Sequence, residues 1–211
     1  MAQPPSHYFD DDPAAPSTPH DIDLVLPDGR VTLTSDRGVF GYESVDPGTK
    51  LLLLAVPPPP QDGHLLDLGC GYGPIAVTMA RRAPAATVWA VDVNERARSL
   101  CAANAARLGL ANLVVASPDE VPDDITFSAV WSNPPIRIGK DALHRLLLRW
   151  LSRLDGDAWL VVHKHLGSDS LQAWLEREGF AVERTSSSRG YRVLRAAGTR
   201  SGPGRINLDP A

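Results

Sequence analysis

Apolar and polar positions change their period along the chain, and this change separates expected strands from expected helices. From residue 65 onward, short apolar runs alternate with longer segments in which apolar residues recur every three or four positions. The runs predict strands at residues 65–68, 87–91, 112–116, 126–131 and 157–163. The periodic segments predict helices at residues 74–82, 95–108, 140–154 and 168–178. Such alternation is typical of a mostly parallel sheet with right-handed crossovers, so we predict a doubly wound α/β fold.

Two hairpins are expected outside this alternation. Residues 22–26 and 30–34 alternate apolar and polar side chains around a Pro-Asp-Gly turn at residues 27–29, which predicts an N-terminal β-hairpin. Residues 180–184 and 191–195 are close enough to form an antiparallel hairpin that closes the sheet.

A short helix is expected between the first hairpin and the core. Asp46 is a good helix cap, Pro47 suits the first helical position, and residues 51–56 supply buried turns. The chain then divides into four parts, which we expect to be a flexible acidic arm at 1–21, a hairpin and helix extension at 22–60, an α/β core at 61–197 and a disordered tail at 198–211.

Composition limits the class of protein but not its partner. The 211 residues, 43% of them hydrophobic, suffice for one core with extensions. No apolar run approaches the roughly 20 residues of a membrane helix, and the start lacks a signal peptide, so we expect a cytoplasmic protein without a membrane partner. Of the 25 acids, five lie in residues 1–23, which leaves 20 acids against 21 bases in the rest. Charge therefore neither supports nor excludes an RNA partner, and the sequence leaves the oligomeric state open.

A glycine-rich turn follows the first core strand. Gly69, Gly71 and Gly73 alternate with other residues, and Pro74 opens the next helix. Glycines let a backbone approach a ligand closely, and the positive helix end faces that ligand. A tight strand-to-helix connection is the alternative explanation. The Gly-x-Gly-x-Gly spacing differs from the Gly-x-Gly-x-x-Gly of dinucleotide sites, which favours S-adenosylmethionine over a nicotinamide cofactor.

Polar residues follow the next two strands. Asp92 comes directly after residues 87–91, where a carboxylate can accept both ribose hydroxyls of an adenosine-bearing cofactor; it could instead cap the helix that begins at Glu95. In the loop after the third strand, Asp119 is favoured slightly over Ser117 for the adenine contact.

The segment Asn133-Pro134-Pro135 follows the fourth core strand. Two prolines continue neither a strand nor a helix, so they end the strand and hold the backbone rigid. A nitrogen whose lone pair is delocalised into a π-system has to be held by hydrogen-bond acceptors and aimed at an electrophilic methyl group. The Asn133 side-chain oxygen and the Pro134 carbonyl can accept from two N–H groups, which predicts that these two residues are catalytic. A plain turn is the alternative.

These segments resemble the class I S-adenosylmethionine-dependent methyltransferases of the small-domain type. Within them, the chain is most similar to the group that includes ribosomal RNA small subunit methyltransferase C, a guanine-N2 enzyme. The resemblance covers residues 22–196 and depends on residues 38–40, 46–52, 67–73, 92, 132–135 and 190–194. It implies a Rossmann-like sheet and a base held by residues 133–135. It also implies an S-adenosyl-L-methionine site, to which we assign Asp67, Gly69, Gly71, Asp92, Asp119 and Asn133.

Two features depart from the family pattern. Position 136 is Ile, whereas many Asn-Pro-Pro enzymes have an aromatic residue there that stacks on the target base. Stacking must then come from elsewhere or be replaced by an apolar wall. The better-known members of the group also carry a second, non-catalytic copy of the domain, for which this chain is too short.

Basic and aromatic residues near the same sheet edge are candidates for substrate contact. We assign Pro135, Ile136, Arg137, Lys140, Phe40 and Arg189 to the substrate site. Further cations, Arg145, Arg149 and Arg192, could contact RNA phosphates or form an ordinary solvated surface. His163 and His165 lack a third ligand at suitable spacing, so no metal is expected.

The expected function is S-adenosylmethionine-dependent N-methylation, with guanine N2 of ribosomal RNA as the acceptor. Enzymes of the same fold that act on protein glutamine, tRNA, DNA adenine or a small molecule are alternatives. A nicotinamide-dependent oxidoreductase would need the third glycine one position later. A non-catalytic S-adenosylmethionine-binding module is the remaining alternative, and the presence of Asp67, Asp92 and Asn133 argues against it.

Overall fold

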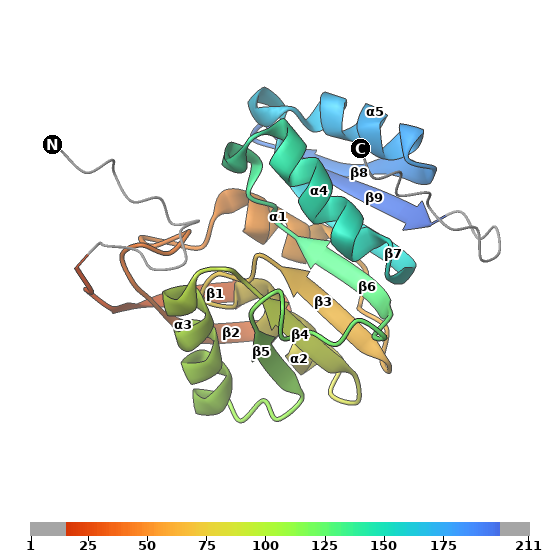
Figure 1. Cartoon of the computed structure of the whole chain (residues 1–211). Helices are drawn as coiled ribbons and strands as arrows, with labels where there is room; N and C mark the ends of the chain where they lie inside the picture. The colour runs from red at the N-terminus through yellow and green to blue at the C-terminus, as the bar shows by residue number, and fades with distance from the viewer. Residues whose placement is uncertain (1–15, 199–211) are drawn as a thin grey trace, which may run out of the picture.

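Seven strands form the central sheet of the computed structural model, which describes residues 16–198 (Figure 1). The sheet order is β5-β4-β3-β6-β7-β9-β8. The strands are β3 (His64–Leu68), β4 (Thr87–Val91), β5 (Leu113–Ala116), β6 (Phe127–Ser132), β7 (Leu154–His163), β8 (Phe180–Ser188) and β9 (Tyr191–Gly198). Neighbours among β3 to β7 are parallel, whereas β9 is antiparallel to β7 and to β8. The predicted doubly wound sheet with a closing antiparallel hairpin is confirmed.

Helices cover both faces of this sheet. One core contains side chains of α1 (Pro47–Ala55), α2 (Pro74–Arg82) and α3 (Glu95–Arg107). The other core contains those of α4 (Lys140–Leu151) and α5 (Ser168–Arg177). Successive residues of a strand point to opposite faces, and the inner strands of a parallel sheet are therefore apolar on both sides.

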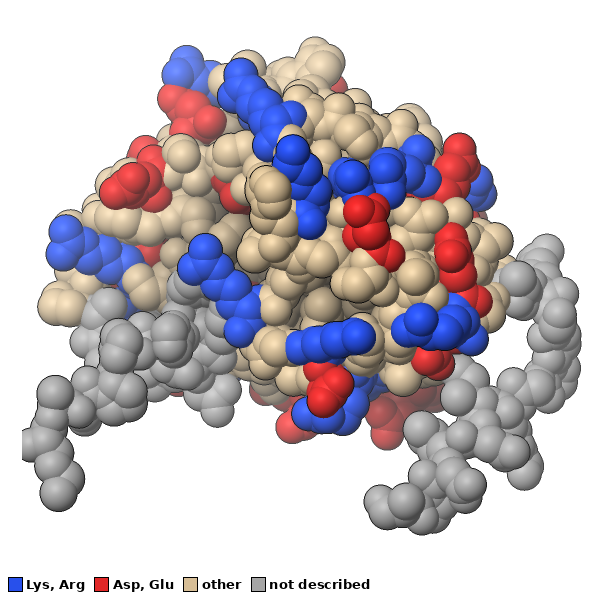
Figure 2. Space-filling model, turned by 90° about the horizontal axis from the view of Figure 1, so that it is seen from above, with Lys and Arg blue, Asp and Glu red and all other residues tan. Residues whose placement is uncertain are grey.

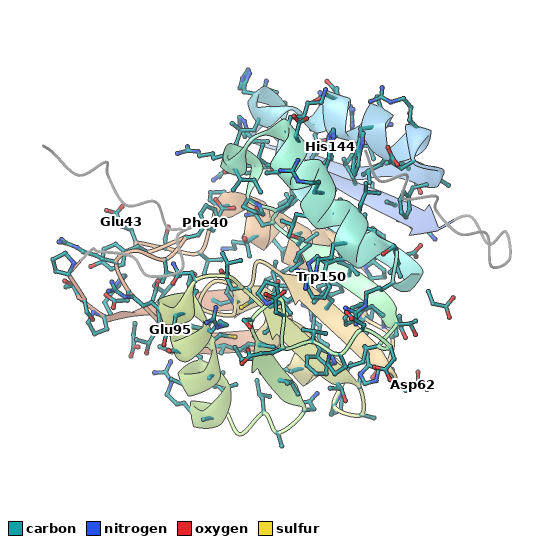
Figure 3. The ribbon with its side chains drawn as sticks, in the orientation of Figure 1. Phe40, Glu43, Asp62, Glu95, His144 and Trp150 are labelled. Carbon is teal, nitrogen blue, oxygen red and sulfur yellow. The ribbon has the colours of Figure 1, made fainter. Side chains whose placement is uncertain are left out.

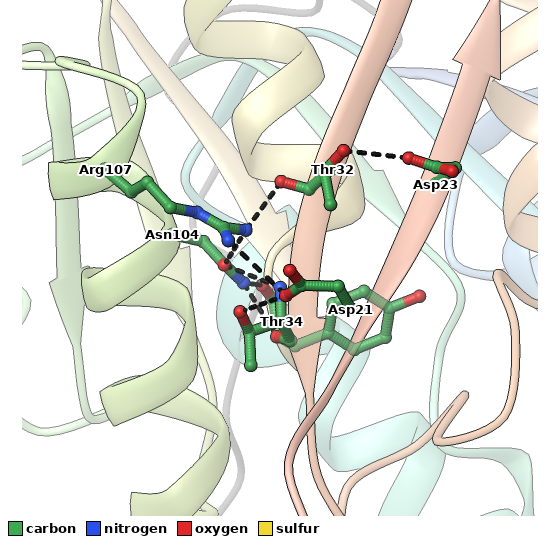
Figure 4. A network of polar contacts seen from close by, with 7 residues as sticks. Asp21, Asp23, Thr32, Thr34, Asn104 and Arg107 are labelled. Carbon is green, nitrogen blue, oxygen red and sulfur yellow. Dashed lines mark hydrogen bonds and ion pairs between the residues drawn. The ribbon is translucent and has the colours of Figure 1, made fainter.

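The N-terminal hairpin forms a second sheet from β1 (His20–Leu26) and β2 (Gly29–Ser35), beside α3 (Figure 1). The buried Asn104 of α3 joins it to the glycine turn (Figure 4). Its Nδ2 donates to the carbonyl oxygens of Thr34 and Tyr72, both at 2.9 Å, and its Oδ1 accepts from the Thr34 N–H at 2.8 Å. Arg107 adds a bond from Nη2 to the Thr32 carbonyl at 2.6 Å. The hairpin is thus attached to the same loop that was predicted to hold the cofactor.

Three details of the predicted elements are wrong. The helix predicted to reach residue 154 ends at Leu151, and β7 begins at Leu154 rather than at residue 157. The reason is that Leu154 pairs with Phe127 of β6, and the Phe127 N–H donates to the Arg153 carbonyl at 2.8 Å. Leu54, predicted to be buried, is 51% exposed, because the helical period turns it away from Leu52 and Leu53.

Part of the predicted acidic arm packs against the domain. The Ser17 hydroxyl and the Thr18 N–H donate to the Asp36 carboxylate at 2.7 and 2.5 Å, and β1 begins at His20. These residues of the predicted acidic arm are therefore attached. The rest of the arm, residues 1–15, and the predicted tail from residue 199 onward lie outside the described residues. Between residues 16 and 198, no helix is both long and apolar enough to cross a membrane.

The sheet order creates a crevice between β3 and β6. After β3 the chain enters α2 on one face, and after β6 it reaches α4 on the other face through the single turn η1 (Ile136–Ile138). Ligands of open α/β sheets bind outside the carboxyl ends of strands at such a switch point. The glycine turn and the Asn-Pro-Pro segment meet there.

Candidate active site

A pocket of about 250 Å³ opens at this switch point. Many of the residues predicted from the sequence line it, namely Phe40, Gly69, Gly71, Asp92, Asn133, Pro134, Pro135, Ile136 and Arg137. Figure 3 shows Phe40 at this end of the central strands and Asp62, which precedes β3, at the opposite end. Asp67, Asp119, Lys140 and Arg189 are outside the lining.

The glycine turn is held by its own backbone donors. The N–H groups of Gly69 and Cys70 donate to the Val91 carbonyl at 2.8 and 3.1 Å, and the Gly71 N–H donates to Asp92 Oδ2 at 2.8 Å. A pyrophosphate would need free N–H groups in this turn. Because these donors are occupied, the turn suits a ligand without a pyrophosphate.

The third glycine of the turn has a packing role. A Cβ added at Gly73, whose φ is +98°, would lie 2.7 Å from the Cys101 sulfur of α3. Any other residue here would push α3 away from the turn, so Gly73 allows the close approach of helix and turn.

Asp67 is a buried acceptor directly behind the pocket wall. It is fully buried beside Leu68, and its Oδ2 accepts from the Ala76 N–H at 2.8 Å. Its Oδ1 has no hydrogen-bond partner among the residues described. Burial raises the pKa of Asp67 well above its usual value. Its unpartnered Oδ1 would pair with a ligand N–H only where that group reaches past the pocket lining.

Asp92 faces the pocket from the end of β4. Asn94 caps α3, since its side chain accepts from the Ala97 N–H at 3.0 Å, so the alternative that Asp92 is the cap is wrong. The Asp92 oxygens accept from the N–H groups of Gly71 and Asn94 at 2.8 and 3.0 Å. Burial raises its pKa. Each oxygen keeps a lone pair for a further donor, such as a hydroxyl.

The side chain of Asn133 has one defined orientation. Its Nδ2 donates to Asp46 Oδ1 at 2.8 Å and to the Thr49 hydroxyl at 3.0 Å, which uses both N–H groups. Its Oδ1 accepts no hydrogen bond from any residue in the described part of the chain, and Asn133 lines the pocket. The pocket is thus offered a hydrogen-bond acceptor, which suits a ligand N–H.

The neighbouring carbonyl of Pro134 is partly engaged. It accepts from the Ile136 N–H at 2.8 Å, which the sequence did not indicate. A carbonyl oxygen has two lone pairs, so one remains for a ligand. Asn133 is therefore the stronger of the two predicted acceptors.

Three residues of the site were not assigned to it from the sequence. Asp46 was predicted only as a helix cap, and Thr49 and Tyr191 had no assigned role, yet Asp46 and Tyr191 line the pocket and Thr49 holds Asn133. The sequence offered one indication of their role, because residues 46–52 and 190–194 belong to the segments that resemble the family.

Neither candidate for the adenine contact lines the pocket. Asp119 pairs with Arg149 at 2.8 Å on the surface, where its side chain is 88% exposed. The Ser117 N–H donates to Glu120 Oε2 at 2.6 Å. Pro118, between them, does line the pocket.

The predicted basic residues fall into two groups. Arg149 and Arg192 are held in ion pairs with Asp119 and Asp169. Arg137, Lys140, Arg145 and Arg189 are exposed, and no residue in the described part of the chain forms an ion pair with them. The Lys164 N–H donates to the Gly190 carbonyl at 2.7 Å, which holds the turn containing Arg189 at the pocket end of β7.

Aromatic side chains line the pocket although position 136 does not supply one. Ile136 is partly buried against the α4 and α5 core. Phe40, which is 38% exposed, lines the pocket together with Tyr191 and His163. The His163 and Tyr191 rings meet edge to face with centroids 4.8 Å apart. Within residues 16–198, no group of three or more His, Cys, Asp or Glu side chains could hold a metal ion.

Comparison with known proteins identifies the family. Residues 30–195 match the family described as methyltransferase small domain. The chain belongs to this family. The methyltransferase assignment predicted from the sequence is thereby confirmed.

Relatives in this family include proteins with and without a named activity. The uncharacterized protein YbxB of Bacillus subtilis is 34% identical over 90% of this chain and 97% of its own length. Ribosomal RNA small subunit methyltransferase C of Shewanella loihica is 30% identical over 77% of this chain, and that of Ectopseudomonas mendocina is 37% identical over 80%. The chain spans only 49% and 56% of these two enzymes.

A solved structure of an rRNA methyltransferase has the same fold. It is the Thermus thermophilus 16S rRNA N2 G1207 methyltransferase in complex with AdoMet and guanosine, with a TM-score of 0.73 and 23% identity. The match covers 89% of this chain and 52% of that one. The likeness supports the predicted fold class.

Proposed function

We propose that this chain is an S-adenosylmethionine-dependent N-methyltransferase that methylates the exocyclic amine of guanine in ribosomal RNA in the cytoplasm. The observation that carries the proposal is the orientation of Asn133. Its N–H groups are bound by Asp46 and Thr49, so an oxygen faces the pocket and selects an acceptor atom that bears N–H. The names of the relatives support ribosomal RNA, and the solved 16S rRNA N2 G1207 methyltransferase with bound guanosine supports guanine N2.

The residues around the turn fit S-adenosylmethionine. The occupied turn donors disfavour a pyrophosphate, and the unpartnered oxygen of Asp67 suits the ammonium group of the amino-acid part. Asp92 would accept the ribose hydroxyls, and Gly69 and Gly71 would lie against the ligand. When bound, the cofactor supplies an electrophilic methyl group on a sulfonium sulfur. The same observations disfavour a nicotinamide dinucleotide.

The chain's own groups would position and stabilise the acceptor nitrogen. Asn133 Oδ1 and the remaining lone pair of the Pro134 carbonyl accept from the two amine N–H groups and fix the direction of the nitrogen lone pair. As the nitrogen forms its fourth bond it becomes positive, and these two preorganised oxygens stabilise that charge. The extra proton then leaves to solvent. Phe40, Tyr191 and Ile136 exclude water from one side of the base.

Basic side chains at the pocket edge support an RNA partner. Arg137 lines the pocket, and Lys140, Lys164 and Arg189 are exposed near the same edge. Figure 2 shows Lys and Arg side chains spread over the face seen from above, with acidic side chains between them. Such cations bind phosphates without reading the base, so they would place an RNA while Asn133 selects the atom.

The test is transfer of a labelled methyl group to RNA from a strain that lacks the gene. Total RNA and isolated ribosomal subunits serve as substrates, and the labelled nucleoside is identified by mass spectrometry after digestion. The proposal predicts N2-methylguanosine from ribosomal RNA. Label found in protein, or in a different nucleoside, would show that the proposed substrate is wrong. Titration calorimetry with S-adenosylmethionine and with a nicotinamide dinucleotide separately tests the cofactor.

A further inference from the structure

The Asp46 carboxylate connects three distant parts of the chain. Its Oδ1 accepts from the Thr49 N–H at 3.0 Å, as a helix cap does, and also from Asn133 Nδ2 at 2.8 Å. Its Oδ2 accepts from the Tyr191 hydroxyl at 3.3 Å. The start of α1, the end of β6 and the start of β9 therefore meet at one side chain.

Close packing holds this carboxylate in place. A Cβ added at Gly48 would lie 2.6 Å from two ring carbons of Tyr191, so the first turn of α1 lies directly against that ring. His163 contacts the same ring edge to face. Burial and the nearby Asp46 charge raise the pKa of the Tyr191 hydroxyl, which keeps it protonated as a donor. Asp46 therefore meets Asn133 in a fixed position.

The acceptor oxygen of Asp46 determines which end of the Asn133 amide faces the pocket. If the amide were turned over, its Oδ1 would meet the Asp46 carboxylate, oxygen against oxygen, and its NH₂ would point into the pocket. A carboxylate has no proton to donate, so that arrangement is repulsive. The observed arrangement instead pairs two N–H groups with Asp46 and Thr49.

We propose that Asp46 is a positioning residue for methyl transfer, because it selects the amide orientation that presents Asn133 Oδ1 to the acceptor nitrogen. Thr49 and Tyr191 support it. The inference relies on the proposed function for the identity of the acceptor, while the orientation itself can be tested without any substrate. It also explains what the N-terminal extension contributes to a core that already contains the Asn-Pro-Pro segment.

A variant that keeps the helix cap but cannot bond to Asn133 distinguishes a role in positioning Asn133 from a role in folding. Asp46→Ser keeps a capping oxygen for Thr49 but is too short to reach Asn133. We expect its kcat to fall ~100-fold, the scale of a misplaced reacting group, with cofactor affinity nearly unchanged and the melting temperature lowered only by the loss of the Asn133 and Tyr191 bonds. Asp46→Asn keeps one side-chain oxygen that can accept from both the Thr49 N–H and Asn133 Nδ2, so its kcat should fall far less. Loss of stability with normal kcat would show that Asp46 is only a cap.

Two further measurements isolate the path through Asn133. In an Asn133→Ala background, Asp46→Ser should have no additional effect on kcat, because the group that it positions is absent. An equal loss in both backgrounds would overturn the proposal. The side-chain amide of Asn133 should also exchange its protons faster in Asp46→Ser, as measured by NMR; unchanged exchange would contradict the proposed contact. This measurement still decides the orientation if no RNA is methylated, an outcome that would count against the proposed function alone.

Discussion

Replacing Asn104 with Ala should both destabilise the protein and weaken cofactor binding. Asn104 is buried in α3, and its amide bonds to Thr34 of β2 (Figure 4) and to Tyr72 of the glycine turn. The substitution removes three hydrogen bonds of 2.8 to 2.9 Å to backbone groups, which lose these partners, and a weaker one of 3.2 Å from Arg107, which keeps its bond to Thr32. The Tyr72 carbonyl lies in the turn itself, so its release should loosen the predicted cofactor site.

The expected magnitude follows from those bonds. A net contribution of about 1 kcal/mol for each bond gives about 3 kcal/mol. The better helix propensity of Ala offsets up to about 0.7 kcal/mol of this loss. The free energy of unfolding should therefore fall by about 2 to 3 kcal/mol, which for a chain of this size lowers the melting temperature by roughly 5 to 12 °C.

A second asparagine provides the matched control. Asn112 Nδ2 donates to the carbonyls of Ala80, Ala83 and Ala86 at 3.0 to 3.2 Å, away from the pocket. Urea unfolding should show a comparable loss for Asn112→Ala and Asn104→Ala. Calorimetry should show weaker S-adenosylmethionine binding only for Asn104→Ala. A loss below about 1 kcal/mol, or equal cofactor affinity in both variants, would refute the role assigned to this network.

Three further substitutions test the electrostatics. Burial raises the pKa of Asp67, so the folded chain loses stability as the pH rises from about 4 through that raised pKa. Asp67→Asn should abolish this loss, which unfolding curves at pH 5 and pH 8 would measure. The same substitution should weaken cofactor binding. The hydrogen bond from Arg82 lowers the pKa of Asp28 to about 2. Asp28→Asn should therefore lower the free energy of unfolding at neutral pH by about 1 kcal/mol, a value discounted because Asp28 is half exposed. The loss should shrink as the pH falls from 4 to 2. Arg137→Gln should reduce the salt dependence of RNA binding by about one charge, whereas Arg177→Gln on α5 should not; equal slopes would remove Arg137 from the RNA site.

The sequence predicts much of the fold because local rules and global packing agree. Gly73 and Pro74 mark where α2 begins, Pro134 follows the end of β6, and both segments lie at the switch point. The error at Leu154 is of a different kind. That residue continues the helical period of α4, but its pairing with Phe127 of the neighbouring strand overrides the period.

The part of the site that the sequence did not predict depends on long-range contacts. Asp46 and Asn133 are 87 positions apart, and a cap motif at Asp46 contains no information about a second partner. Asp119 illustrates the converse, because an acid in the expected loop is drawn to Arg149 on the surface instead of to the pocket. Motifs locate the residues of such a site, but contacts between distant segments determine how each side chain is oriented.

The most direct test of the account is the methylation rate of Asn133→Ala. Its central claim is that the Asn133 oxygen holds the acceptor nitrogen, while Asp67, Asp92 and the glycine turn provide most of the cofactor binding. We predict a fall in kcat of at least ~100-fold, the scale seen when one preorganised polar contact to the transition state is removed, with S-adenosylmethionine affinity within about threefold of the parent by calorimetry. Near-normal turnover in Asn133→Ala would contradict the account.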